Sequence, residues 1–484
     1  IAILESSRLI AGLEDVLSAF LADTYMHKGL VLSETTGCHR EAAELLDKSI
    51  ATYQQLVAKQ HRTEFVLALA RTLNNKARLL SHATDTDGAL RLYEQARSLL
   101  RSEEPDVVEE DMARLCNNIG VTLCSAHRER EALPYLDEAL DLYSNMTQRS
   151  VRPDCMSLLA NVCINKAGAL NVLGDAGAAS AVSDRAISIC RCLREQHNDK
   201  EAGPGLARAL MNRAHAAKIL GTAENAVSFY DKAIGVLTGL VETGGRLELR
   251  QELAKAFSIK AATLHNLGER HGALALFEKS IQIGEHLFIT ERHRETAAGL
   301  AKDCMNKARI MKELGRGKEA LDLYDRAITV WRNALGMKGT SAELAAEADA
   351  EAAADLASAY LVRAVALKDA GDLPSAAASQ KEGLRTYEQL GRAGVHHAVD
   401  LAKAYMSHGI LLQTMGDISA ADEAYKSAIA SWEALVRRDG ARQWAGYIAD
   451  ACLHRARVLQ ALGDEQEARR HILMAQEYAV YLRK

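Results

Sequence analysis

Apolar residues recur at helical spacing along almost the whole chain, in paired segments that a glycine separates. The segment from Leu206 to Leu237 reads LARALMNRAHAAKILGTAENAVSFYDKAIGVL, and the segment from Leu253 to Gly284 reads LAKAFSIKAATLHNLGERHGALALFEKSIQIG. In each half, apolar residues lie three, four and seven positions apart, which places them on one face of an α-helix. The pattern predicts units of two amphipathic helices joined by a turn.

The unit is repeated along the chain. A small residue in its first helix, which we call the anchor, recurs at a spacing of 47 residues in five of nine intervals. Periods of this length indicate a solenoid, in which each unit packs mainly on its neighbours. The sequence therefore predicts one elongated all-α molecule over residues 1–484. The ten anchors are Gly29, Ala77, Gly120, Ala167, Ala214, Ala261, Ala308, Ala364, Gly409 and Ala456.

Other small residues keep a fixed place relative to the anchors. Alanines recur at two later points of most repeats, and a large apolar residue often lies between them, as Tyr230 does between Ala226 and Ala233. A glycine seven residues after the anchor has the place of a helix end that needs left-handed backbone. These glycines are Gly174, Gly221, Gly268, Gly315, Gly371, Gly416 and Gly463.

This combination resembles the tetratricopeptide repeat family, which has a small residue in helix A, a glycine at the turn, and alanines and an aromatic residue along helix B. The usual family period is about 34 residues, so a period of 47 predicts longer helices, of about 18–22 residues each. The resemblance implies a right-handed superhelical solenoid of about ten antiparallel helix pairs, with helix A lining an inner groove.

Three segments depart from the regular pattern. The spacing of 56 between Ala308 and Ala364 predicts an insertion at residues 338–355, either as added helical turns or as a local kink. Residues 1–13 match the end of a preceding helix B. The chain stops soon after Ala475 without the polar cap that solenoids need, so we expect a fragment of a longer protein or an array whose ends partners cover.

Composition narrows the classes of function. The net charge of −5 argues against nucleic-acid binding, and we find neither a membrane-spanning apolar run nor a signal peptide. Four of the nine cysteines lie four residues before an anchor, where other repeats have Leu, Phe or Tyr. Thiols spread through a helical core favour a reducing, cytoplasmic location. These four are Cys116, Cys163, Cys304 and Cys452.

Catalytic signatures are absent from the sequence. It contains no H-E-x-x-H, G-x-S-x-G or phosphate-binding loop motif. The glycine-rich segment Gly315–Lys318 is a turn between helices, and the pair His396–His397 lies in a loop between repeats. We therefore expect no enzyme activity, no metal site and no cofactor.

The resemblance implies that residues six and two positions before each anchor face a ligand in the groove. Five asparagines occupy the second of these positions: Asn75, Asn118, Asn165, Asn212 and Asn306. An amide both donates and accepts, so this column could bind the backbone of an extended peptide whatever its sequence. The alternative is that these asparagines only cap or solvate the face.

Basic residues occupy the position six before the anchor, which is unexpected in an acidic chain. They are Arg71, Arg114, Arg208, Lys255, Lys302 and Lys403. They resemble the basic positions of carboxylate-clamp modules, although the lysine that those modules use near the fifth consensus position is missing. An acidic or extended peptide is the expected ligand, and a solvated basic face is the alternative.

A further column predicts ion pairs between helices. The residue just before most anchors is basic, as in Lys260 and Lys307, and helix B carries an acid seventeen residues after most anchors, as in Asp231, Glu278 and Asp325. We expect these residues to form stacked ion pairs between helices, with little energy per pair but a contribution to the register of the repeats.

The sequence thus favours a non-catalytic scaffold that binds a protein or peptide. Two alternatives stay open: the regulatory or recognition arm of a larger signalling enzyme, such as a kinase or caspase-like protease, and a peptide-sensing regulator. The latter would need a DNA-binding head that this chain lacks.

Overall fold

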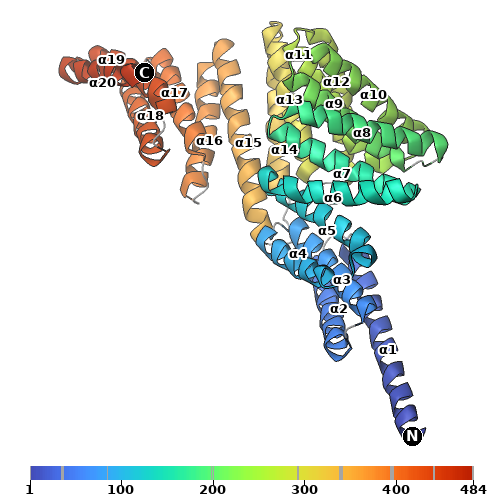
Figure 1. Cartoon of the computed structure of the whole chain (residues 1–484). Coiled ribbons are helices and arrows are strands. Elements are labelled where there is room, and N and C mark those ends of the chain that lie inside the picture. The colour runs from blue at the N-terminus through green and yellow to red at the C-terminus, as the bar shows by residue number, and fades with distance from the viewer. Residues whose placement is uncertain are drawn as a thin grey trace. The chain divides into compact units, whose positions relative to one another are not determined.

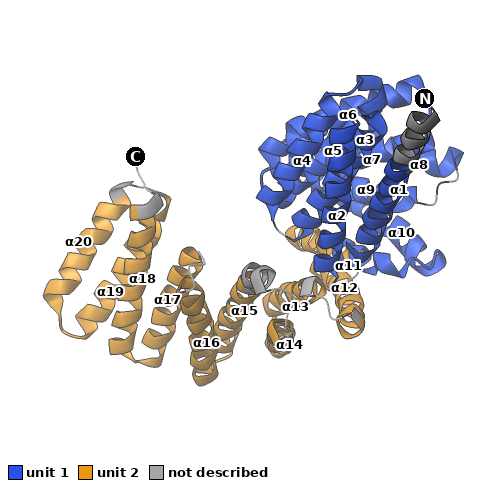
Figure 2. Cartoon of the chain, turned by 90° about the horizontal axis from the view of Figure 1, so that it is seen from below, with its two compact units in different colours: residues 1–256 blue, residues 257–484 orange. Residues whose placement is uncertain are grey.

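The computed structural model describes residues 2–33, 38–60, 62–83, 85–197, 199, 201–291, 294–336, 342–392, 397–439 and 442–481. This part of the chain contains 20 α-helices and no strand, so the predicted all-α repeat fold is confirmed. Contacts divide the chain into two compact units, residues 1–256 and 257–484 (Figure 2). We describe each unit by itself, and one continuous solenoid stays a prediction. Residues 338–341 of the expected insertion, and His396, lie outside the described residues.

The helices follow one another as antiparallel pairs, in which odd-numbered helices are helix A and even-numbered helices are helix B (Figure 1). Unit 1 contains α1 (Ala2–Ser33), α2 (His39–Lys59), α3 (Thr63–His82), α4 (Thr86–Arg101), α5 (Pro105–Ser125), α6 (Glu129–Arg149), α7 (Pro153–Val172), α8 (Ala176–Gln196), α9 (Ala202–Ile219) and α10 (Ala223–Thr238). The boundary between the units falls within α11 (Arg250–Asn266). Unit 2 continues with α12 (Arg270–Glu291), α13 (Arg294–Glu313), α14 (Gly317–Gly336), α15 (Ala342–Asp369), α16 (Leu373–Arg392), α17 (Ala398–Met415), α18 (Ile418–Asp439), α19 (Ala445–Ala461) and α20 (Glu465–Tyr481).

The turn between helix A and helix B has left-handed backbone. All seven predicted glycines have positive φ, from +76° at Gly221 to +84° at Gly416. In the third repeat the same position holds His127, with φ +56°, which is a conformation that a side chain disfavours. An aspartate often follows and caps helix B: Asp175, for example, accepts the N–H of Ala178 at 3.1 Å.

The core follows the predicted small and large positions. Five alanine anchors, Ala77 among them, are fully buried, and the large residues of helix B fill the space beside them, as with Tyr93 and Tyr230 at 1% exposure. At the anchor Gly120, an added Cβ would lie 2.6 Å from the Leu136 side chain. Such close approach of the two helices explains why the anchor is small.

The predicted ion ladder is confirmed in both units. In unit 1, Arg213 of α9 meets Asp184 of α8 at 3.0 Å, and in unit 2, Arg363 of α15 meets Asp325 of α14 at 2.6 Å. Three further rungs of the same register are Lys76–Asp47, Lys166–Asp137 and Lys307–Glu278. Each of these rungs joins a helix A to the preceding helix B and so helps to fix the register between repeats.

Two of the irregular segments can be described. Residues 2–33 form one uninterrupted helix, so no turn separates residues 2–13 from the helix that carries Gly29. The expectation that residues 1–13 are the end of a preceding helix B stays a prediction. Residues 342–355 of the expected insertion lie within α15, a single helix of 28 residues, whereas its neighbours α14 and α16 each have 20.

Candidate functional site

The A helices of unit 1 form a wall on the inner side of its curve. Successive odd-numbered helices from α1 to α9 contact one another, whereas successive even-numbered helices make at most marginal contact among the described residues. Because the A helices approach more closely than the B helices, the stack curves towards them. Three of the basic residues six before the anchors are exposed on this wall: Arg71, Arg114 and Arg208. Lys255, on α11, is also exposed.

The asparagine column of unit 1 links adjacent A helices. The Asn118 Nδ2 donates to the Oδ1 of Asn74 at 3.0 Å, and the Asn165 Nδ2 donates to the Oδ1 of Asn117 at 2.9 Å. In the next repeat, the Asn212 Nδ2 donates to the carbonyl oxygen of Ile164 at 2.8 Å. Each donor lies two residues before its anchor, and each acceptor lies three residues before the preceding anchor. The column therefore has a structural role, and each amide keeps one N–H and its own oxygen for a ligand.

Two asparagines of the predicted column have no hydrogen bond to a described side chain or backbone group. They are Asn75 in α3 of unit 1 and Asn306 in α13 of unit 2, and both are partly exposed. Their amides keep their full donor and acceptor capacity.

Part of the basic column is neutralised by acids of the next repeat. Arg71 donates from Nε and Nη2 to the two carboxylate oxygens of Asp111, both at 2.8 Å. This hydrogen bonding raises the pKa of Arg71. In unit 2, the Lys302 ammonium forms an ion pair with the Asp355 carboxylate at 3.1 Å. Sequence reasoning missed these acids. Both stand nine residues before an anchor, which is a shared sequence position, but that position alone does not say which basic residue each acid faces.

The other basic residues differ in how far they are neutralised. Arg114 pairs with Glu110 of its own helix at 2.8 Å. Arg208 reaches only the Asn161 amide oxygen, at 3.4 Å. Neither Lys255 nor Lys403 forms an ion pair with a described residue. In unit 1, Arg208 and Lys255 are thus the cations best placed to meet an outside anion.

A cavity of about 240 Å³ brings three of the predicted residues together on the wall of unit 1. Arg71, Asn75 and Arg114 line it beside Asp111. Its other lining residues are Met26, Leu30, Ala70, Asn74, Leu100 and Leu115. A mostly apolar floor with a few convergent polar groups is the usual chemistry of a ligand pocket. The remaining predicted residues lie outside this cavity.

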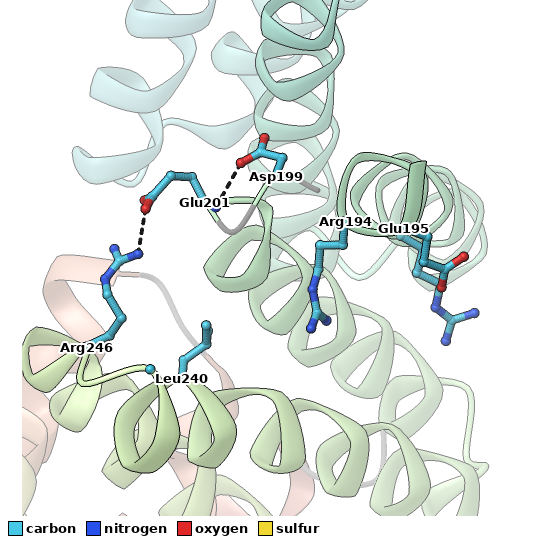
Figure 3. A pocket seen from close by; sticks show the side chains of 8 residues that line it. Arg194, Glu195, Asp199, Glu201, Leu240 and Arg246 are labelled. Atoms are coloured by element: carbon cyan, nitrogen blue, oxygen red, sulfur yellow. Dashed lines mark hydrogen bonds and ion pairs between the residues drawn. The ribbon is translucent and has the colours of Figure 1, made fainter. Parts of the chain in front are cut away.

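A second cavity, of about 440 Å³, lies near the ends of α8 and α10 (Figure 3). Arg246 meets Glu201 at 2.9 Å, and the carboxylate of Asp199 accepts the Glu201 N–H at 2.8 Å. Arg194 points towards the hollow from α8, and Leu240 forms part of its floor. No sequence pattern indicates this cavity, whose acidic and basic groups largely balance.

The described residues lack two kinds of feature. No group of three or more His, Cys, Asp or Glu side chains among them could hold a metal ion. None of the described helices is long and apolar enough to cross a membrane.

Four segments of the chain match models of a known repeat family. One model described as tetratricopeptide repeat matches residues 112–145, 253–288 and 304–340, and a second model of the same description matches residues 207–236. Among curated protein sequences, none matches the chain significantly.

Solved structures with similar folds are known. The apo form of RapI is 11% identical, with a TM-score of 0.50, over 86% of this chain and 99% of RapI. The apo form of the quorum sensor NprR from B. thuringiensis is 14% identical, with a TM-score of 0.49, over 86% and 99%. BtubC from P. vanneervenii is 19% identical, with a TM-score of 0.41, over 53% and 90%. At such identities the similarity concerns the fold alone.

Proposed function

Because the chain is a tetratricopeptide repeat protein, we propose that it is a non-catalytic scaffold whose A-helix wall binds an extended segment of a protein or peptide. The observation that carries this proposal is the cavity of unit 1, in which Arg71, Asn75 and Arg114 meet over an apolar floor. Three residues of one predicted surface thus border one hollow, as expected of a binding wall.

The lining of this cavity indicates which ligand chemistry would fit. Arg71 is paired with Asp111 and Arg114 with Glu110, but each guanidinium keeps further N–H donors, which can bind an anionic group. The floor of Met26 and leucines favours an apolar side chain. We therefore propose a peptide that places an acidic residue close to an apolar one.

The amide column supports an extended backbone as the ligand. In the asparagine column, Asn118, Asn165 and Asn212 each keep one N–H donor and the amide oxygen after bonding the preceding repeat. Asn75 keeps all of its amide donors and its acceptor. Amide groups at regular intervals can form hydrogen bonds with a peptide backbone, and these bonds do not depend on the side chains of the peptide.

The proposal includes a reducing, cytoplasmic compartment. All nine cysteines are free thiols, and six of them are buried. Burial raises the pKa of the Cys116 and Cys304 thiols to about 12, which keeps them protonated and unreactive. Such a distribution is typical of proteins that never meet an oxidising environment.

The test is a charge reversal that leaves the fold alone. Arg208→Glu with Lys255→Glu removes two exposed cations that form no ion pair with described residues. The matched control is Arg130→Glu with Arg191→Glu, which makes the same charge change at exposed residues of two B helices, α6 and α8. A partner is first captured with the wild-type chain, and its affinity for each variant is then measured by calorimetry at two salt concentrations.

We expect the wall variant to bind about tenfold or more weakly, because charged hydrogen bonds contribute about 1.5–3 kcal/mol each. The control should bind like the wild type, and wild-type affinity should fall as salt rises. Equal affinity of the wall variant and the wild type, with helicity intact, would contradict the proposal.

A further inference from the structure

The ion ladder of unit 1 is interrupted between α4 and α5. Most rungs have a basic residue just before the anchor, but α5 has Ile119 there. The acid of this rung, Glu94, stands at the expected place on α4 and is exposed. No described residue forms an ion pair with Glu94. The rung therefore has its anion and lacks its cation.

A complete rung two repeats further along the chain shows which contacts the interrupted rung lacks. There Arg213 meets Asp184 at 3.0 Å and also lies over the ring of Phe229, 4.8 Å from its centroid. Phe229 lies on the helix B that follows Arg213. Its equivalent at the interrupted rung is Tyr135, so both the acid and the aromatic ring are in place and only the cation is absent.

A cavity of about 330 Å³ lies at the interrupted rung. Its lining includes Glu94 and Tyr135, with Ile119, Leu90 and Leu123 as apolar residues. The lining also holds Arg128, but two hydrogen bonds to Glu131 satisfy it. The hollow is of the size of a small ligand pocket, and it has the elements that a long basic side chain needs: an apolar surface for the stem, a ring, and an unpaired carboxylate.

We propose that this cavity is a socket for an arginine or lysine side chain of a partner protein. The stem would lie on Ile119 and Leu90, and the charge would meet Glu94 and the Tyr135 ring. Arg97 also lies over that ring, with its guanidinium 5.1 Å from the centroid, but it does not line the cavity. This site is separate from the A-helix wall and does not depend on the proposed function.

One residue of the protein could compete for the socket. Arg91 lies on α4 one turn before Glu94, lines the cavity and forms no ion pair with a described residue. As a like charge it would repel an incoming cation, so Arg91→Gln should tighten binding of a basic side chain.

The interruption at α17 differs from this one. The residue before its anchor is His408, and the residue of α16 at the place of the ladder acid is Lys381. That position lacks the acid as well as the cation and offers no equivalent socket.

The experiment is a ligand-observed NMR titration of the whole chain with Nα-acetyl-arginine methylamide. The neutral isostere Nα-acetyl-citrulline methylamide is the control probe. We expect saturable binding of the arginine probe in the millimolar range, as for a small fragment, and at least tenfold weaker binding of the citrulline probe.

Three variants make the result specific. Glu94→Gln, a substitution of an exposed residue, should lower the affinity for the arginine probe by about tenfold. Ile119→Arg should complete the rung and abolish binding. Asp184→Asn, at the complete rung, should leave binding unchanged.

The proposal is overturned by three results: no saturable binding to the wild type, equal binding to Glu94→Gln, or binding that appears only in Arg91→Gln. The last would show that Arg91 fills the cavity in the wild type.

Discussion

Arg71 of α3 donates two hydrogen bonds of 2.8 Å to Asp111 of α5, one repeat further along the chain. Asp111 is only 8% exposed, whereas the Arg71 side chain is 53% exposed. The arginine thus stands on the binding wall and at the same time neutralises a carboxylate within it. A residue that the sequence assigns to ligand binding can therefore also hold two repeats together.

The first prediction concerns this pair. Arg71→Ala should lower the free energy of unfolding by about 1–3 kcal/mol, because it leaves the Asp111 carboxylate buried without its donor. The control is Arg208→Ala, at the same repeat position but without a carboxylate partner, which should cost less than about 0.5 kcal/mol. Urea unfolding followed by circular dichroism measures both. Equal losses in the two variants would mean that the pair contributes nothing of its own.

The second prediction concerns a buried acid in unit 2. Asp303 is 5% exposed and accepts hydrogen bonds from Ser258 and Ser280, and no described cation forms an ion pair with it. Burial raises its pKa above the usual value for an aspartate. The folded chain therefore binds this proton more tightly than the unfolded chain, and stability falls as the pH rises through the folded-state pKa.

Asp303→Asn should consequently be more stable than the wild type at neutral pH, and the difference should shrink as the pH falls through the raised pKa of Asp303 towards the ordinary aspartate value. The nearby pair of Lys307 and Glu278 is present in both proteins and cancels in the comparison, although its own contribution has the opposite sign because the pKa of Glu278 is lowered. Melting temperatures from pH 4 to pH 8 give the profile. A difference that grows towards acid would contradict the burial effect.

The third prediction concerns the one described non-glycine residue with positive φ. His127 stands where seven other repeats have glycine, and its side chain is 94% exposed. His127→Gly should raise the free energy of unfolding by up to about 1 kcal/mol, since the left-handed conformation costs a side chain about 1–2 kcal/mol and glycine loses part of that gain through its freedom in the unfolded chain.

Gly221→Ala is the converse control. The backbone there has φ +76° and an added Cβ would meet nothing within 4 Å, so only the backbone conformation is tested. Gly221→Ala should lower the free energy of unfolding by about 1 kcal/mol. If His127→Gly lowers the melting temperature, the histidine must make a stabilising contact that outweighs its conformation.

The register of the repeat could be predicted from the sequence because it depends on local patterns. Glycines at helix ends, buried alanines and the ladder rung Lys307–Glu278 all follow from fixed offsets along the chain. The pairing of Arg71 with Asp111 could not, because it depends on the axial offset between neighbouring A helices, which the repeat length does not contain.

The same limit applies to the asparagine column. Its register placed Asn118 and Asn165 correctly on the A helices, but the direction of each amide is decided by the facing residue of the preceding repeat. Cavities depend even more on such contacts, since the hollow near Ile119 is lined by residues of three successive helices, α4, α5 and α6.

The central claim, that the A-helix wall receives the partner, is tested most directly by site-specific photo-crosslinking in cells. Benzoylphenylalanine is placed in turn at three wall positions, Asn75, Arg114 and Arg208, and at two positions on B helices, Arg130 and Arg191. The side chains at all five positions are at least partly exposed. We expect adducts of a discrete mass from the wall positions and none of that mass from the helix B positions. Adducts from the helix B positions alone, with the wall silent, would contradict the claim.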